Sequence, residues 1–222
     1  MNIDLATFDQ QKYPRYGNAN PERMAMPFWE RMVQNRASAH WARTHFNATY
    51  QDTPDPVWCF DRFGMSETVL ADGRTVYVGG EHEDFYDPDF FIYNDVVVVD
   101  LDGEIDIYGY PKDVFPPTDF HSATPVENYL WIIGCLGYLE ERQPGVTPVY
   151  RLDYQSFQIE QIHTSGRNPG WISGHQAVYD AENTRIVLTD GHRFEWNAQQ
   201  QIYHAVQDIF WLDLPTLSWH LV

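Results

Sequence analysis

The sequence predicts a mainly β fold, in which three copies of a four-strand unit follow a short helical segment. Apolar runs that reach a glycine recur at Thr75–Gly80, Leu130–Cys135 and Ile186–Gly191, spaced 55 and then 56 residues apart. A second set of apolar runs closes in an aspartate, at Asp100, Asp153 and Asp213, which are 53 and 60 residues apart. Short β-branched runs that recur at a regular spacing are typical of repeated antiparallel sheets.

Each unit contains one further strand before these two runs and one after them. The expected first strands cover Ser66–Val69, His121–Thr124 and Gly174–Val178, and the expected fourth strands cover Glu104–Tyr108, Phe157–Ile162 and Leu217–Leu221. Asp-Gly pairs at 72–73 and 102–103 are typical of tight hairpin turns, so strands that are neighbours in the chain should pair. The units then cover about 60–115, 116–170 and 171–222, within a β part over 57–222.

Residues 1–56 have a different pattern. The first 22 residues are rich in Pro, Gly and Asn and show little periodicity, so we expect coil there. A helix is predicted over about 27–46, because Pro27 suits a first helical turn and apolar residues at 28, 29, 32, 33 and 37 form a stripe. We expect this stripe to pack on the β part as a cap, with residues 51–56 as a linker.

The net charge of −18 belongs to the β part. Residues 1–60 hold six basic and six acidic residues of the chain's 14 and 32, so the remaining 8 and 26 lie beyond residue 60. Ten carboxylates and no Lys or Arg lie between Glu81 and Asp106. Such an acidic chain is a poor ligand for nucleic acid, whose phosphates attract basic surfaces.

The sequence also bears on the compartment. No apolar run approaches the roughly 20 residues that a membrane helix needs, and the polar N-terminus lacks the apolar stretch of a signal peptide. Two cysteines, Cys59 and Cys135, cannot form a disulfide scaffold. We therefore expect free thiols, a cytoplasmic protein and no membrane contact.

The repeated unit resembles the kelch repeat. Gly79–Gly80 matches that family's paired glycines, Gly134–Cys135 and Asp190–Gly191 keep one glycine each, and Trp219 lies where the family has its fourth-strand Trp. Ile107 and Ile159 are assigned to that place in the first two units. The resemblance covers about residues 60–222 and implies a β-propeller, a ring of radial sheets whose gaps the abundant aromatic residues would fill.

Three units are fewer than the four to eight blades of usual propellers. Residues 1–60 could supply part of a further blade, two chains could close a six-bladed ring as a homodimer, or an open arc could have its edge capped by the helix. A fragment of a longer protein is the fourth alternative. Since the chain runs from Met1 to the end of a fourth strand, we expect a complete, capped arc in preference to the ring.

The candidate binding residues lie in the loop between the second and third strands of each unit. The first loop, Glu81–Phe91, is densely acidic, but its spacing does not fit a calcium-binding EF-hand. We expect no metal or cofactor and assign binding to Glu81, His82, Glu83, Asp84, Tyr86, Asp87, Asp89, Tyr138, His192, Phe194 and Trp196. The alternative for Phe194 and Trp196 is that they pack their loop onto its own sheet.

No catalytic residue is assigned. The sequence has no G-x-S-x-G elbow, no H-E-x-x-H helix and no glycine-rich phosphate loop. His121 and His175 lie at matching positions of two repeats, which indicates a framework role with hydrogen bonds inside the sheets.

These patterns favour a non-enzymatic interaction protein that binds a basic protein partner through an acidic, aromatic loop face. A bacterial immunity or antitoxin role is one version of this hypothesis. The alternative is a small-molecule or carbohydrate-processing enzyme or binder, with its site in the propeller mouth and Tyr86, Tyr138 or Trp196 stacked on sugar rings. A deep pocket lined by Glu81, His82, Tyr138 and His192 would favour the alternative.

Overall fold

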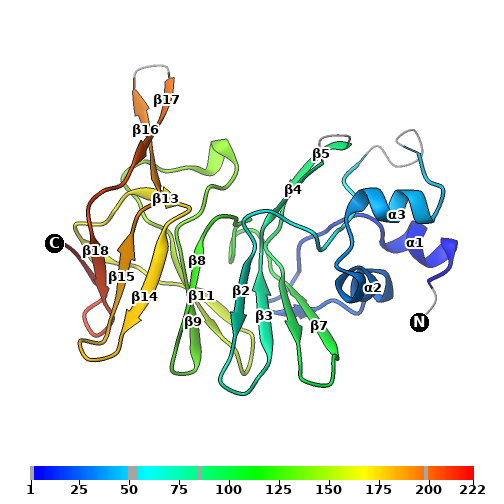
Figure 1. Cartoon of the computed structure of the whole chain (residues 1–222), viewed down its shortest axis with the longest axis horizontal. Coiled ribbons are helices and arrows are strands. Elements are labelled where there is room, and N and C mark those ends of the chain that lie inside the picture. Colours follow the sequence, from blue (N-terminus) through cyan, green and yellow to red (C-terminus); the bar gives the residue numbers. More distant parts are fainter. Residues whose placement is uncertain (1–2, 50–54, 85–86, 198–199) are drawn as a thin grey trace.

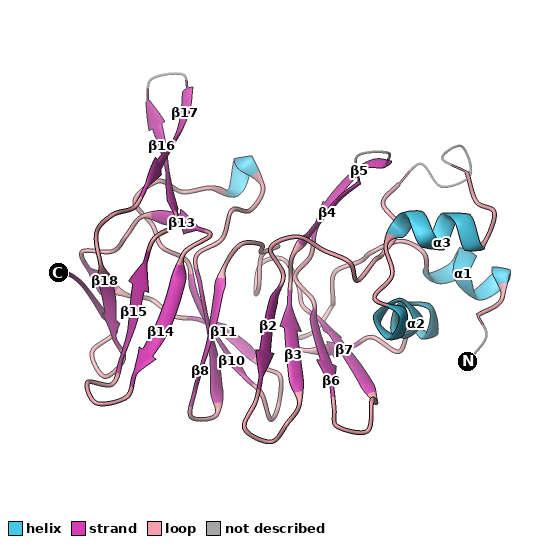
Figure 2. Cartoon of the chain, in the orientation of Figure 1, coloured by secondary structure: helices cyan, strands magenta, loops and turns pink. Residues whose placement is uncertain are grey.

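The computed structural model describes residues 3–49, 55–84, 87–197 and 200–222, and the mainly β prediction is confirmed (Figure 2). Three sheets lie side by side, and a helical segment packs against one end of the row (Figure 1). Among the described residues, no helix is long and apolar enough to cross a membrane.

The three main sheets repeat one strand order. The first sheet has the order β1-β7-β6-β3-β2, the second β11-β10-β9-β8, and the third β12-β19-β18-β15-β14. The first sheet comprises β1 (Glu22–Arg23), β2 (Ser66–Val69), β3 (Thr75–Val78), β6 (Val96–Val99) and β7 (Ile105–Gly109). The second comprises β8 (Ser122–Val126), β9 (Tyr129–Ile133), β10 (Val149–Asp153) and β11 (Ile159–Gln161). The third comprises β12 (Ser165–Gly166), β14 (Gln176–Asp180), β15 (Arg185–Thr189), β18 (Phe210–Asp213) and β19 (Ser218–Leu221).

The predicted four-strand order is present in each sheet, and two sheets gain a strand that the sequence did not suggest. Strand β1 pairs with β7, and β12 pairs with β19, so the first and third sheets have five strands. Both extra strands are two residues long, too short for an alternating pattern to reveal them.

The closing aspartates form the turns that lead into the fourth strands. Asp100 Oδ1 accepts hydrogen bonds from the backbone N–H of Asp102 and Glu104 at 2.9 and 2.8 Å. Asp153 Oδ1 accepts from Gln155 N–H at 2.8 Å, and Asp213 Oδ2 from Thr216 N–H at 3.0 Å. Each carboxylate therefore satisfies turn N–H groups, which explains why an acid ends all three runs.

The fourth-strand assignment in the first sheet needs a correction. The pairs at matching register are Val99 with Ile105, Leu152 with Ile159, and Leu212 with Trp219. Ile105, and not Ile107, therefore occupies the place of Trp219, because the turn after Asp100 is one residue shorter than its counterparts.

The first 60 residues contain more helix than expected. Helix α1 (Leu5–Gln11) lies where coil was expected, and the single helix predicted over 27–46 is instead α2 (Pro27–Asn35) and α3 (Ala39–His45). The break comes at Arg36, which has a left-handed backbone with φ of 48°, and Ser38 then caps α3 by accepting a hydrogen bond from Trp41 N–H.

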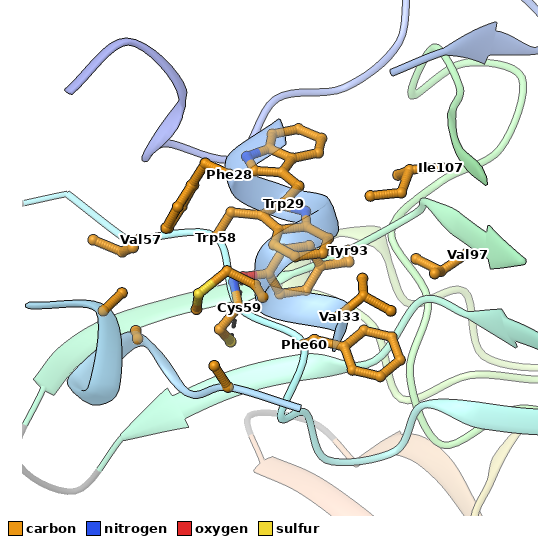
Figure 3. Close-up of a cluster of buried hydrophobic side chains, with 14 of the residues drawn as sticks. Phe28, Trp29, Val33, Val57, Trp58, Cys59, Phe60, Tyr93, Val97 and Ile107 are labelled. Carbon is orange, nitrogen blue, oxygen red and sulfur yellow. Dashed lines mark hydrogen bonds between the residues drawn. The ribbon is translucent and has the colours of Figure 1, made fainter. Parts of the chain in front are cut away.

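The predicted apolar stripe is buried against the first sheet. Phe28, Trp29, Met32, Val33 and Ala37 share one core with Tyr77, Val97 and Ile107 of the sheet. Figure 3 shows this core, in which the Trp29 and Trp58 rings stack with centroids 4.9 Å apart. The helical segment thus covers the face of the first sheet that points away from the second sheet.

A buried ion pair fastens the segment after the helices to the same sheet. The Arg62 guanidinium contacts the Asp95 carboxylate at 2.5 Å, and Trp58 Nε1 donates to the same carboxylate at 2.9 Å. The guanidinium also lies 3.4 Å from the centre of the Tyr93 ring. Each charge of this pair has several partners, as buried charges require.

Each pair of neighbouring sheets shares its own apolar core and one histidine–serine hydrogen bond. One core lies between the first and second sheets and another between the second and third. His121 Nε2 contacts Ser66 Oγ at 2.8 Å, and His175 Nε2 contacts Ser122 Oγ at 2.9 Å. The two histidines therefore join neighbouring sheets, which corrects the expectation that they bond within one.

Candidate functional site

Three excursions project from one end of the sheets, which we call the loop side (Figure 1). They are the hairpin of β4 (Glu81–Asp84) and β5 (Asp87–Ile92), the turn of helix η1 (Leu139–Glu141), and the hairpin of β16 (His192–Asn197) and β17 (Gln200–Ala205). Strand β13 (Trp171–Ser173) pairs with β16 at the base of the second hairpin. Two segments expected as loops are thus hairpins. The first is rich in Asp and Glu, which are depleted in strands, whereas the alternation of charged and aromatic residues over 193–196 is itself a strand signal.

The first hairpin carries most of the predicted acidic residues. Glu81 is half-buried and pairs with Phe63 through its backbone, and His82 is buried. The backbones of Glu83, Asp84, Asp87 and Asp89 belong to β4 and β5, whereas their side chains and the whole of Tyr86 lie outside the described residues.

Tyr138 lies against this hairpin. Its ring packs edge-on against the Phe90 ring with centroids 5.7 Å apart, and its hydroxyl accepts a hydrogen bond from Ile92 N–H at 2.9 Å. The structure therefore brings together Tyr138 and the hairpin, two parts of the predicted site that come from different units. Burial raises the pKa of the Tyr138 hydroxyl.

Sequence reasoning missed Tyr16 and Lys112, which join the same group. Tyr16 stacks on Phe91 with centroids 5.5 Å apart. The Lys112 ammonium lies 4.9 Å from the centre of the Tyr16 ring, 5.6 Å from that of Tyr138 and 3.7 Å from Glu141 Oε1. Tyr16 precedes the repeats, and Lys112 follows the fourth strand of the first unit, so neither lies in a strand or loop to which the sequence assigned binding.

The remaining predicted residues lie on the second hairpin, where one is buried and two are exposed. Phe194 is buried with Cys135 and Trp171, which agrees with the packing alternative, whereas Trp196 is 51% exposed and His192 is exposed. Arg142 connects this hairpin to the η1 turn, because it donates to Gly137 O and contacts the Tyr203 hydroxyl.

A fully buried carboxyl group lies beneath these excursions. Asp119 Oδ1 accepts a hydrogen bond from Gly137 N–H at 2.6 Å, and its side chain also bonds to Glu81. Burial, the largest cause, raises the pKa of Asp119, and the hydrogen bonds with Gly137 and Glu81 act in the opposite direction. Phe63 and Ser173 stand at the matching repeat positions, so the repeat pattern gave no signal for this carboxyl.

A pocket of about 340 Å³ adjoins the η1 turn, where Lys112, Glu140, Glu141, Tyr150, Gln161 and Trp171 form part of its wall. Glu81, His82, Tyr138 and His192 do not line it, so it is not the pocket envisaged for the small-molecule alternative. Its volume lies at the small end of ligand sites, which begin near roughly 300 Å³.

The described residues include two free thiols, both of them buried. The same residues contain no group of three or more His, Cys, Asp or Glu side chains able to hold a metal. Burial raises the pKa of Cys59 to about 12 and that of Cys135 further, so neither thiol is a ready nucleophile.

Six exposed apolar side chains lie on the loop side. Phe63, Phe90, Leu139, Val146, Trp196 and Tyr203 are each at least 40% exposed, and all lie on the excursions or at their bases. Exposed aromatic residues among charges are typical of protein-binding surfaces.

No family model and no curated protein matches the chain. Among solved structures it is similar to one titled "Structure of YjhT", with a TM-score of 0.51 and 13% sequence identity. The similarity covers 71% of this chain and 54% of that chain, so the chain spans about half the length of that structure. At this identity the similarity concerns the fold and carries no activity over to this chain.

Proposed function

We propose that the three sheets are blades of a kelch-like β-propeller arc. Three features support this: the repeated strand order, the side-by-side packing of the sheets, and left-handed backbones at matching residues Gly79, Gly134 and Asp190.

We propose that the protein is a non-enzymatic interaction module whose loop side binds a basic protein in the cytoplasm. The observation that carries this proposal is the group of exposed apolar side chains on that side, in a β part that holds all of the −18 charge. Acidic surroundings would speed the encounter with a basic partner, and the exposed rings would supply contact area.

The test uses the immobilised full chain in an extract of its native host, at low and high salt. Phe90→Ser with Trp196→Ser removes two loop-side rings that are 43% and 51% exposed. The control, Leu101→Ser with Val178→Ser, removes apolar groups that are 78% and 66% exposed on other surfaces.

A basic protein should be retained by the wild type and the control, and about tenfold less by the loop-side variant. Retention should weaken at high salt, because the electrostatic attraction is screened. Equal retention by both variants, or no retained protein at either salt, would overturn the proposal.

A further inference from the structure

The Lys112 side chain occupies a cage formed by Tyr16, Tyr138 and Glu141. Its ammonium lies within 6 Å of both ring centres and 3.7 Å from the carboxylate. Two aromatic rings and a carboxylate around one cation form an arrangement that proteins use to recognise cationic groups.

The rings of the cage are held by contacts that do not involve Lys112. The Tyr138 hydroxyl accepts from Ile92 N–H at 2.9 Å, and the Tyr16 hydroxyl donates to Ile92 O at 3.4 Å. Stacking on Phe91 also holds the Tyr16 ring. The cage would therefore keep its shape if the ammonium left, and such preorganisation favours a replacement cation.

Lys112 is held weakly. Its side chain is 48% exposed, and its 3.7 Å separation from Glu141 is longer than a charge-assisted hydrogen bond. Ion pairs of this kind contribute little to stability, so displacing the ammonium costs little.

The surroundings leave room and charge for another cation. The pocket of about 340 Å³ beside Lys112 is walled by Glu140, Glu141, Tyr150 and Trp171, which supply two carboxylates and two aromatic faces. Burial and the neighbouring Glu140 raise the pKa of Glu141, although Lys112 acts in the opposite direction. Two carboxylates, those of Glu140 and Glu141, share this wall with one ammonium, that of Lys112.

We propose that Lys112 is an internal occupant of a cation site, and that a lysine or arginine side chain of the partner displaces it and extends into the pocket. This inference rests on the proposed function, because it specifies which feature of a basic partner the loop side recognises.

The test measures binding of amidated hexalysine, hexaarginine and hexaglutamine to the full chain by calorimetry. Lys112→Met removes the competing ammonium and keeps an unbranched side chain, so the affinity for hexalysine should rise about threefold. Arg151→Met is the matched control, because Arg151 also pairs with a glutamate, Glu160, but lies on the second sheet. It should leave the affinity nearly unchanged, and hexaglutamine should not bind.

A second pair of variants tests the carboxylate. In the Lys112→Met background, Glu141→Gln should lower the affinity about fivefold, whereas Glu160→Gln should not. Equal gains from Lys112→Met and Arg151→Met would show that only the overall charge matters, and would overturn the cage. A loss of affinity in Lys112→Met would overturn it as well.

The two proposals fail in different ways. If the loop-side variant loses the partner while Lys112→Met binds the peptides as the wild type does, the proposed interaction function is supported and the proposed cation site is wrong. If Lys112→Met binds hexalysine more tightly while the loop-side variant retains as much partner as the wild type, the cation site is supported and the proposed protein-binding function is wrong.

Discussion

His121 and His175 are buried, uncharged histidines that hydrogen-bond between neighbouring sheets. Each ring bridges two sheets, and burial lowers the pKa of His121 to about 3 and of His175 to about 4, from the ordinary 6.5. The rings are therefore neutral in the folded protein at physiological pH. They serve as hydrogen-bonding parts of the framework, and a proton on either ring would oppose the fold.

Their depressed pKa values predict a loss of stability in acid. Below pH 6.5 the unfolded chain protonates these rings and the folded chain does not, so unfolding becomes easier until the pH reaches about 4 for His175 and about 3 for His121. Asp119 acts in the opposite direction, because its raised pKa favours the folded state in acid. Urea midpoints measured between neutral pH and about pH 5 should fall less in His121→Gln than in the wild type. The exposed His192→Gln variant is the control, and equal slopes in all three proteins would contradict the prediction.

Arg62 links the end of the helical segment to the first sheet. Its side chain is fully buried between Trp58 and Tyr93 and is paired with Asp95. Arg62→Met leaves that carboxylate buried without its cation, so we expect a loss of about 3–5 kcal/mol in the free energy of unfolding. Arg74→Met breaks an exposed pair with Asp72 and should cost less than about 1 kcal/mol. Chemical denaturation measures both, and similar losses would show that the buried pair is not the anchor.

At the scale of elements, two glycines allow neighbouring units to approach closely, because a side chain at either position would clash with the backbone of the next unit. A Cβ added at Gly79 would lie 2.2 Å from Thr118 O, and one at Gly134 would lie 2.3 Å from Ile172 O. These are equivalent positions in two repeats, so the repeated glycine sets how closely one sheet approaches the segment that leads into the next. The sequence showed the glycine, and the structure shows the contact that requires it.

Two alanine variants separate this contact from backbone strain. Gly134 and Gly145 both have left-handed backbones, with φ of 70° and 81°, but nothing lies within 4 Å of a Cβ at Gly145. Gly145→Ala should cost about 1 kcal/mol from the backbone alone, and Gly134→Ala a further 1–3 kcal/mol, roughly, from the clash. The difference between their unfolding free energies measures the contact. Equal losses would mean that the sheets can move apart at no cost.

At the scale of the whole molecule, the helical segment decides how the row of sheets can grow. It buries Tyr77, Val97 and Ile107 on the outer face of the first sheet, the face that a ring of two chains would need for its closing contact. The first and third sheets therefore end the row differently, one under helices and the other bare. This asymmetry favours the capped arc over the six-bladed homodimer.

The capped arc predicts a monomer. Sedimentation equilibrium of the pure chain should give 26.0 kDa at all loading concentrations. Omitting residues 1–60 would uncover the apolar face of the first sheet, so that variant should self-associate or unfold. A stable dimer of the full chain would contradict the capped arc.

The sequence by itself determined the four repeated strands of each of the three units, their hairpin turns and the apolar stripe of the helical segment. These features follow from local chemistry: alternating apolar residues, Asp-Gly turns, and aspartates that cap the turns they precede. Tertiary structure decided which side chains meet. Tyr16, Lys112 and Tyr138 come from three distant segments, and Asp119 is buried beside Gly137 without any repeat to mark it. No local pattern encodes such encounters, because they depend on how the sheets and the helical segment pack, and that packing is what forms the loop side.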